Sequence, residues 1–207
     1  MSYKIAIDSC GELLDEWKND GRIESIPLTL TVGGENIIDD ENFNQKDFLK
    51  KVAACPECPK SACPSPERYM KAYECDAEHI YAVTLSAELS GSYNSAILGK
   101  NLFLEEQPEK KVHVFNSKSA SGGQSLIAMK IVECEEKGLS FEEVVKRSGW
   151  PAGRVNRVLN EVCDIGMIEY NWENADHHKQ FVLPQFVPGA AEFMVMNKDL
   201  VEEHPIV

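Results

Sequence analysis

The 207-residue chain has no apolar run near the ~18 residues that a helix needs to cross a bilayer. Its start carries a single lysine before a strand-like pattern, and it lacks the basic segment and long apolar stretch of a secretory signal. The sequence therefore predicts a cytoplasmic protein that does not insert into a membrane.

Several catalytic signatures are also missing. There is no GxGxxG fingerprint and no Walker lysine loop, so a dinucleotide or a nucleoside triphosphate lacks support. There is no GxSxG elbow of a hydrolase either. His79 and His113 fall within strand patterns, where a packed histidine is commoner than a general base.

Positive charge is scarce, since the net charge is −13. Residues 147–207 hold five Lys/Arg against nine Asp/Glu, so they lack the basic stripe that nonspecific DNA affinity requires. This argues against nucleic-acid binding, although a winged-helix regulator stays open as an alternative. His177 and His178 are adjacent and would point apart on a strand, which disfavours a metal site there.

The seven cysteines do not suggest a disulfide framework, because their number is odd and the start is that of a cytoplasmic chain. Cys55, Cys58 and Cys63 follow CxxCx4C spacing in ACPECPKSACP, a stretch cut by prolines. Zinc sites favour a second CxxC or a histidine pair, and iron–sulfur clusters as a rule need four cysteines. A metal or redox module on these three cysteines is therefore an alternative function rather than the preferred one.

The chain has the 43% hydrophobic content of a globular protein, and strand and helix patterns alternate over its first two-thirds. This alternation predicts an α/β fold with a mainly parallel sheet flanked by helices. The expected strands are Tyr3–Asp8, Ile26–Val32, Asn36–Ile38, His79–Thr84 and Val112–Asn116, with a hairpin turn at Gly33-Gly34. The expected helices are Glu12–Lys18, Asn44–Ala54, Pro66–Cys75, Ser92–Glu106, Gln124–Lys137 and Phe141–Ser148.

After residue 146 the order of predicted helices and strands changes. A helical pattern over Pro151–Ile165 precedes two strand-like stretches, MIEYNW and KQFVLP, around a polar loop. Helix, turn, helix and hairpin is the order of a winged helix. We therefore expect two domains, 1–146 and 147–207, the second a small α+β segment.

Serine and glycine gather where three predicted strands end, in Asp8–Gly11, Thr84–Ser92 and Asn116–Gly123. In a parallel sheet these junctions share the carboxyl edge, where ligands of open α/β folds bind. Hydroxyls and free N–H groups at a helix N-terminus can hold an anion. The alternative is that Ser90 or Ser92 merely caps a helix.

Five short sequence elements of this chain occur in the same order in the DegV family, which the chain resembles over about residues 3–146. They are the N-terminal DS, the hairpin IPLTLTVGGENI, SACPSP, TLSAELSGSYNSA and VFNSKSASGGQSLIA. The family comprises bacterial fatty-acid-binding proteins that present acyl chains to a fatty acid kinase. The resemblance implies that Ser61, usually threonine in the family, and Ser90 hold the fatty-acid carboxylate. Gly91 and Ser92 complete that loop, and the supporting loops are expected at Asp8, Ser9, Ser119, Ser121, Gly122 and Gly123.

The resemblance thus implies a carrier of a long-chain fatty acid, with no catalytic residues, no cofactor and no metal. A carboxylate held by hydroxyls needs no catalytic base, in agreement with the missing one. Family members continue with a domain that forms the second wall of an acyl tunnel. Here residues 147–207 resemble instead the winged-helix-like start of anaerobic bacterial iron–sulfur oxidoreductases. We expect an exposed apolar groove that self-association into a homodimer could close.

Overall fold

The computed structural model describes residues 2–149, 168–170 and 184–186. Its main sheet has four parallel strands in the order β2-β1-β6-β7. The strand bounds are β1 (Tyr3–Asp8), β2 (Ile23–Ile26), β6 (His79–Thr84) and β7 (Lys111–Asn116). The two central strands, β1 and β6, consist largely of apolar residues that are buried. Such continuous apolar runs are typical of parallel strands that are covered on both faces.

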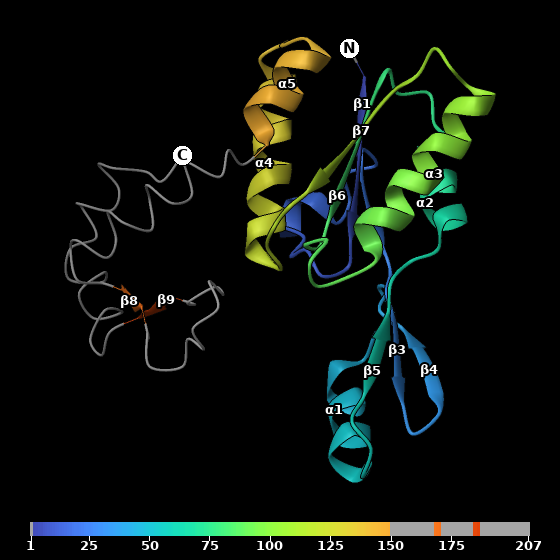
Figure 1. Cartoon of the computed structure of the whole chain (residues 1–207), viewed down its shortest axis with the longest axis vertical. Coiled ribbons are helices and arrows are strands. Elements are labelled where there is room, and N and C mark those ends of the chain that lie inside the picture. The colour runs from blue at the N-terminus through green and yellow to red at the C-terminus, as the bar shows by residue number, and fades with distance from the viewer. Residues whose placement is uncertain (1, 150–167, 171–183, 187–207) are drawn as a thin grey trace, which may run out of the picture. The chain divides into compact units, whose positions relative to one another are not determined.

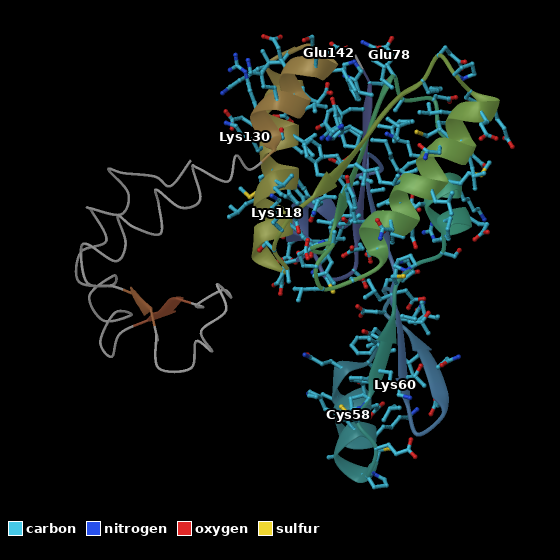
Figure 2. All side chains as sticks on the ribbon, viewed as in Figure 1. Cys58, Lys60, Glu78, Lys118, Lys130 and Glu142 are labelled. Carbon is cyan, nitrogen blue, oxygen red and sulfur yellow. The ribbon has the colours of Figure 1, made fainter. Side chains whose placement is uncertain are left out.

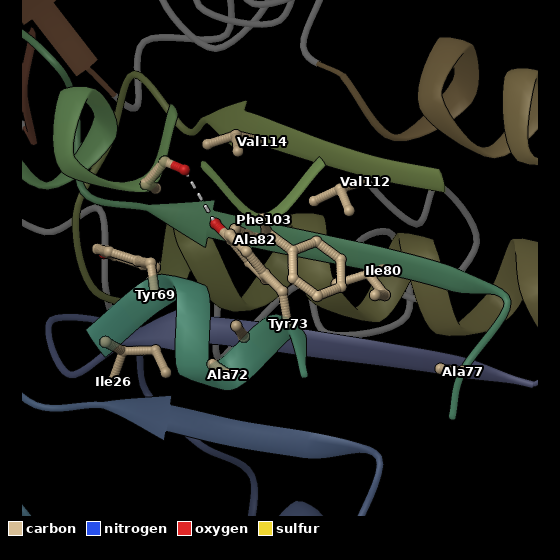
Figure 3. Close-up of a cluster of buried hydrophobic side chains, with 12 residues drawn as sticks. Ile26, Tyr69, Ala72, Tyr73, Ala77, Ile80, Ala82, Phe103, Val112 and Val114 are labelled. Carbon is tan, nitrogen blue, oxygen red and sulfur yellow. Dashed lines mark hydrogen bonds between the residues drawn. The ribbon is translucent and has the colours of Figure 1, made fainter. Parts of the chain in front are cut away.

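Helices cover both faces of this sheet (Figure 1). On one side lie α2 (Pro66–Tyr73) and α3 (Ser92–Glu106), and on the other lie α4 (Gly122–Glu136) and α5 (Phe141–Ser148). Tyr73 and Phe103 pack edge to face between the α2–α3 pair and the sheet, and the Tyr73 hydroxyl donates to the Ala96 carbonyl at 3.2 Å (Figure 3). The core therefore binds the helices firmly to the strands whose ends carry the predicted site.

A second sheet, of order β4-β3-β5 and antiparallel, extends away from the main one (Figure 1). It comprises β3 (Thr29–Val32), β4 (Glu35–Ile38) and β5 (Lys60–Ala62), and with α1 (Gln45–Ala54) it forms what we call the small lobe. Gly33 and Gly34 both have positive φ, at 56° and 82°, as a two-residue hairpin requires. The Asn44 side chain accepts from the Asp47 amide and starts α1.

The α/β class with a parallel sheet is confirmed, but three local expectations were wrong. Ile26–Val32 is not one strand, because Ile26 ends β2 in the main sheet and Thr29 begins β3 in the small lobe. Glu12–Lys18 forms only a 3₁₀ turn, Asp15–Trp17, since so short a segment cannot sustain a helix without packing. Lys60–Ala62, where no strand was expected, pairs with β3 as β5.

Two short strands, β8 (Ile168–Tyr170) and β9 (Pro184–Phe186), pair in antiparallel fashion. The helix expected at Pro151–Ile165 and the His177-His178 pair lie outside the described residues. So does most of the winged-helix-like segment, and the boundary at residue 146 stays a prediction. In the part of the chain that the structure describes, no helix is both long and apolar enough to span a membrane.

Candidate functional site

The three serine- and glycine-bearing junctions meet at one edge of the main sheet, because β1, β6 and β7 are adjacent and parallel. Their loops are bonded to one another. The Ser86 amide donates to the Ser119 carbonyl at 2.9 Å, and the Ser121 hydroxyl donates to the Glu12 carboxylate at 3.2 Å. Figure 2 shows Lys118, which follows β7, at the opposite end of the sheet from Glu78, which precedes β6.

Asp8 lies at the centre of this edge and is fully buried. Its carboxylate accepts from the Leu85 amide at 2.7 Å, from the Gln124 side-chain amide at 2.8 Å and from the Cys10 amide at 3.3 Å. Burial raises the pKa of Asp8, and the hydrogen bonds from the Gln124 side chain and the Leu85 amide oppose that rise. Asp8 therefore joins the end of β1 to the loop after β6 and to α4.

The loop before α3 presents the exposed part of the site. Gly91 is the N-cap of α3, Ser90 is half-buried, and Ser92 is fully buried. The Ser92 amide donates to the Ser90 hydroxyl at 3.2 Å, and the two hydroxyl oxygens are 3.1 Å apart. The Ser90 side chain thus accepts from the first amide of α3 without being its N-cap, and it is also partly open to solvent.

The cysteine- and proline-rich stretch reaches this loop through Cys63. A Cβ atom placed on Gly91 would lie 3.0 Å from the Cys63 sulfur, which also contacts the Ser95 hydroxyl at 3.7 Å. Ser61, two residues earlier, is exposed in β5 opposite Leu30. The structure therefore brings the end of SACPS against LSGS and leaves the Ser61 hydroxyl on the surface of the small lobe.

The loop after β7 uses its side chains mainly to hold its own shape. The Asn116 side chain accepts from the Ala87 and Lys118 amides at 3.1 and 3.0 Å. A Cβ on Gly123 would lie 2.1 Å from the Ser119 hydroxyl, so only glycine fits there. Gly122, by contrast, has open space beside it. The Ser119 side chain therefore packs against Gly123 within its own loop, and the role of this loop as a support of the site stays a prediction.

Cys55, Cys58 and Cys63 are not gathered at one point. Cys55 lies near the β3–β4 turn at Gly33, while Cys63 lies at Gly91. Cys58 is exposed and belongs to the small lobe, as Figure 2 shows. Among the residues described, no three potential metal ligands converge.

The sequence did not indicate the roles of three residues at this edge of the sheet. They are Asn116, whose side chain bonds two loop amides, Gln124 and Tyr69. Gln124 is fully buried with its carbonyl oxygen unbonded. The Tyr69 hydroxyl of α2 is buried near Ser92 and Asp8, without a hydrogen-bond partner of good geometry. The available signal for Gln124 and Tyr69 was a polar group at a position where helical spacing predicts an apolar one. Only the fold shows the direction in which these two side chains point.

Comparison with known proteins places this arrangement in a family. A DegV domain-containing protein of Streptococcus gordonii is 40% identical over 148 residues, covering 70% of this chain and 52% of the relative. A DegV family protein of Ruminococcus gnavus, solved with vaccenic acid, is 55% identical with a TM-score of 0.70, covering 72% of this chain and 53% of that one.

The fatty acid kinase B3 protein of Streptococcus pneumoniae, loaded with linoleic acid, is 30% identical with a TM-score of 0.70 over 98% of this chain and 79% of that one. The chain spans about half the length of the curated relatives it matches. The family model described as "Uncharacterised protein, DegV family" matches residues 2–149. The chain belongs to the DegV family.

Proposed function

We propose that the chain binds a long-chain fatty acid non-covalently and holds its carboxylate at the loop before α3. The observation that carries this is the half-buried Ser90 hydroxyl at the N-terminus of a 15-residue helix. A hydroxyl donor and the positive end of a helix dipole suit a carboxylate, and neither performs chemistry on it. Gly91 and Ser92 shape this loop, and Ser61 supplies a second hydroxyl from the small lobe.

Two related structures support the ligand class, since one was solved with vaccenic acid and the other with linoleic acid. Burial of an acyl chain contributes about 0.8 kcal/mol per CH₂, so the chain supplies most of the affinity while the serines orient the head group. Leu89, next to Ser90, is 71% exposed and offers apolar surface where the chain would begin.

The wider role is part of the same proposal. We infer a carrier rather than an enzyme, which presents its fatty acid to a fatty acid kinase and uses no cofactor. A cytoplasmic location and a homodimer that covers the apolar groove belong to this proposal. The iron–sulfur oxidoreductase-like character of residues 147–207 is a prediction from sequence alone.

Mass spectrometry of solvent extracts of the purified chain tests the binding. We expect a near-stoichiometric fatty acid in the wild type and a large loss in Ser90→Ala. Ser61→Ala should lose less, because Ser61 is the more exposed of the two. Ser2→Ala, ahead of β1 at the other end of the sheet, is the matched control. Wild-type protein that carries no fatty acid and takes up no added oleate would contradict the proposal.

A further inference from the structure

Ser9 joins the small lobe to the main sheet through its hydroxyl group. The Ser9 hydroxyl donates to the Asp39 carboxylate at 2.7 Å and accepts from the Leu28 amide at 3.0 Å. Ser9 follows β1, while Leu28 precedes β3 and Asp39 follows β4. One side chain at the edge of the main sheet therefore binds both strands of the lobe's hairpin at their base.

The base of this hairpin is a regular pair of residues in the small sheet. The Asp39 amide donates to the Leu28 carbonyl at 2.9 Å, which continues the β3–β4 ladder by one pair beyond Thr29 and Ile38. Leu28 is 5% exposed, so its side chain is packed as well. Because the Ser9 hydroxyl binds both members of this pair, it fixes the direction in which the small sheet leaves the main one.

Ser61 lies in the same small sheet, close to the hairpin base. In β5 it is opposite Leu30, two residues along β3 from Leu28, a distance of about 7 Å along the strand. The other end of β5 leads to Cys63, whose sulfur lies 3.7 Å from the Ser95 hydroxyl of α3. Ser61 therefore lies between two contacts of the small lobe, one at the hairpin base and one with α3.

The small lobe has little apolar packing of its own. Helix α1 has no buried residue, and β4 is largely exposed. Two single-chain links, at residues 27–28 and 63–65, join the lobe to the elements of the main sheet. Segments with little buried apolar surface move at a low cost in free energy. Because Ser61 and Ser90 stand on opposite sides of this junction, the distance between their hydroxyls depends on how firmly the lobe is held.

We propose that Ser9 and Asp39 are positioning residues for the fatty-acid carboxylate. Their hydrogen bond holds the small lobe where the Ser61 hydroxyl reaches the ligand bound at Ser90. Both residues act through the base of β3 and β4 rather than by contact with the ligand. This inference rests on the proposed function, because it needs a carboxylate that the two serines share.

A double-mutant cycle tests the proposal, with the oleate affinity of the full chain measured by fluorescence competition with a labelled fatty acid. Ser61→Ala should weaken binding about threefold to tenfold, the usual value of one hydrogen bond. Ser9→Ala should weaken it by a similar factor, and the double variant by no more than either, because a misplaced Ser61 no longer contributes. Ser90→Ala should cause the same loss in the wild type and in Ser9→Ala.

Further variants separate positioning from a general loss of stability. Ser9→Thr keeps the hydroxyl and should bind oleate nearly as well as the wild type. Asp39→Ala removes the same contact from the side of the lobe, so it replaces Ser9→Ala in the cycle if that variant does not fold. Asp40→Ala is the matched control, because it removes the same charge from a carboxylate that accepts from the Asn42 amide within the lobe. In the unliganded chain, Ser9→Ala should speed amide hydrogen exchange in β3, β4 and β5 and leave β6 unchanged.

The outcomes separate this inference from the proposed function. Losses from Ser9→Ala and Ser61→Ala that add up in the double variant would overturn the inference alone. Wild-type affinity in Ser9→Ala, no loss from Ser61→Ala, or equal coupling of Ser9 to Ser61 and to Ser90 would do the same. Failure of oleate to bind the wild type at all would overturn the proposed function and the inference with it.

Discussion

His79 and Glu135 form a buried pair, with Nδ1 of the histidine 2.7 Å from Oε1 of the glutamate. The same glutamate oxygen accepts the Tyr81 hydroxyl at 2.6 Å, and Phe141 of α5 stacks on the Tyr81 ring. This cluster lies near the start of β6, away from the candidate site, and it joins α4 and α5 to the sheet.

Replacement of Glu135 by alanine should therefore destabilise the fold by about 3 kcal/mol, because it leaves two buried polar groups without their partner. Urea unfolding followed by circular dichroism measures this change. Glu136→Ala is the matched control, since its side chain is 60% exposed and should cost under about 0.5 kcal/mol. Equal effects of the two substitutions would show that the cluster does not stabilise the α4–α5 face.

Gly91→Ala should weaken fatty-acid binding. The new methyl group would lie 3.0 Å from the Cys63 sulfur, so the sulfur must move by a few tenths of an ångström and the SACPS and LSGS segments lose their close fit. We expect a loss of stability of about 1 kcal/mol, the low end for overpacking, and a fall of about twofold to fivefold in oleate affinity because the binding loop shifts. Fluorescence competition with a labelled fatty acid measures the affinity.

The contact also predicts a rescue. Cys63→Ala removes the sulfur, so the double variant should recover most of the lost affinity. Gly21→Ala serves as control, because Gly21 lies outside the candidate site and a Cβ there meets nothing within 4 Å. A double variant as weak as Gly91→Ala would mean that Cys63 is not the obstacle.

Gly99→Ala should lower stability without a direct effect on the site. A Cβ there would lie 2.5 Å from the Pro66 carbonyl and 3.0 Å from the Tyr69 Cβ, where α2 and α3 cross. Because backbone atoms cannot move aside easily, we expect a loss of about 2–3 kcal/mol in urea unfolding. Gly21→Ala has open space and should change little. Equal stability of the two variants would contradict the close approach of these helices.

Cys10 should react slowly with iodoacetamide at neutral pH. Burial raises the pKa of its thiol first, and the charges of Asp8 and Asp39 raise it further, so less of the reactive thiolate is present at a given pH. The pH midpoint of alkylation at Cys10, followed by peptide mass spectrometry, should shift downward in Asp8→Asn. Exposed Cys58, in the small lobe, should be alkylated at the same rate in both proteins. An unchanged midpoint at Cys10 would exclude an effect of Asp8 on this thiol.

The sequence predicted the alternation of elements well because it depends on local signals. β1, β6, α3 and α5 begin and end where their apolar periods and caps do. The break between Ile26 and Thr29 was missed, since one apolar pattern runs through both sheets. Only pairing with β1 on one side and β4 on the other separates them.

The site was predictable only in part, for a similar reason. Serine and glycine at strand ends indicated the sheet edge, because the rule that parallel strands share an edge needs only their order. The roles of Gln124 and Tyr69 depend on the direction in which a buried helical side chain points. Likewise, Cys63, which follows β5, approaches Gly91 at the start of α3, and the spacing of neighbouring residues in the sequence does not indicate this contact.

The small lobe contributes little to the protein's cooperative core, since α1 has no buried residue and β4 is largely exposed. Segments with so few apolar contacts open at a lower free energy than the sheet they leave. Ser61 and Ser90 therefore belong to two cooperative units of unequal stability. A ligand that both serines hold would slow amide hydrogen exchange in β3, β4 and β5 far more than in β6, so the weaker unit would report occupancy of the site.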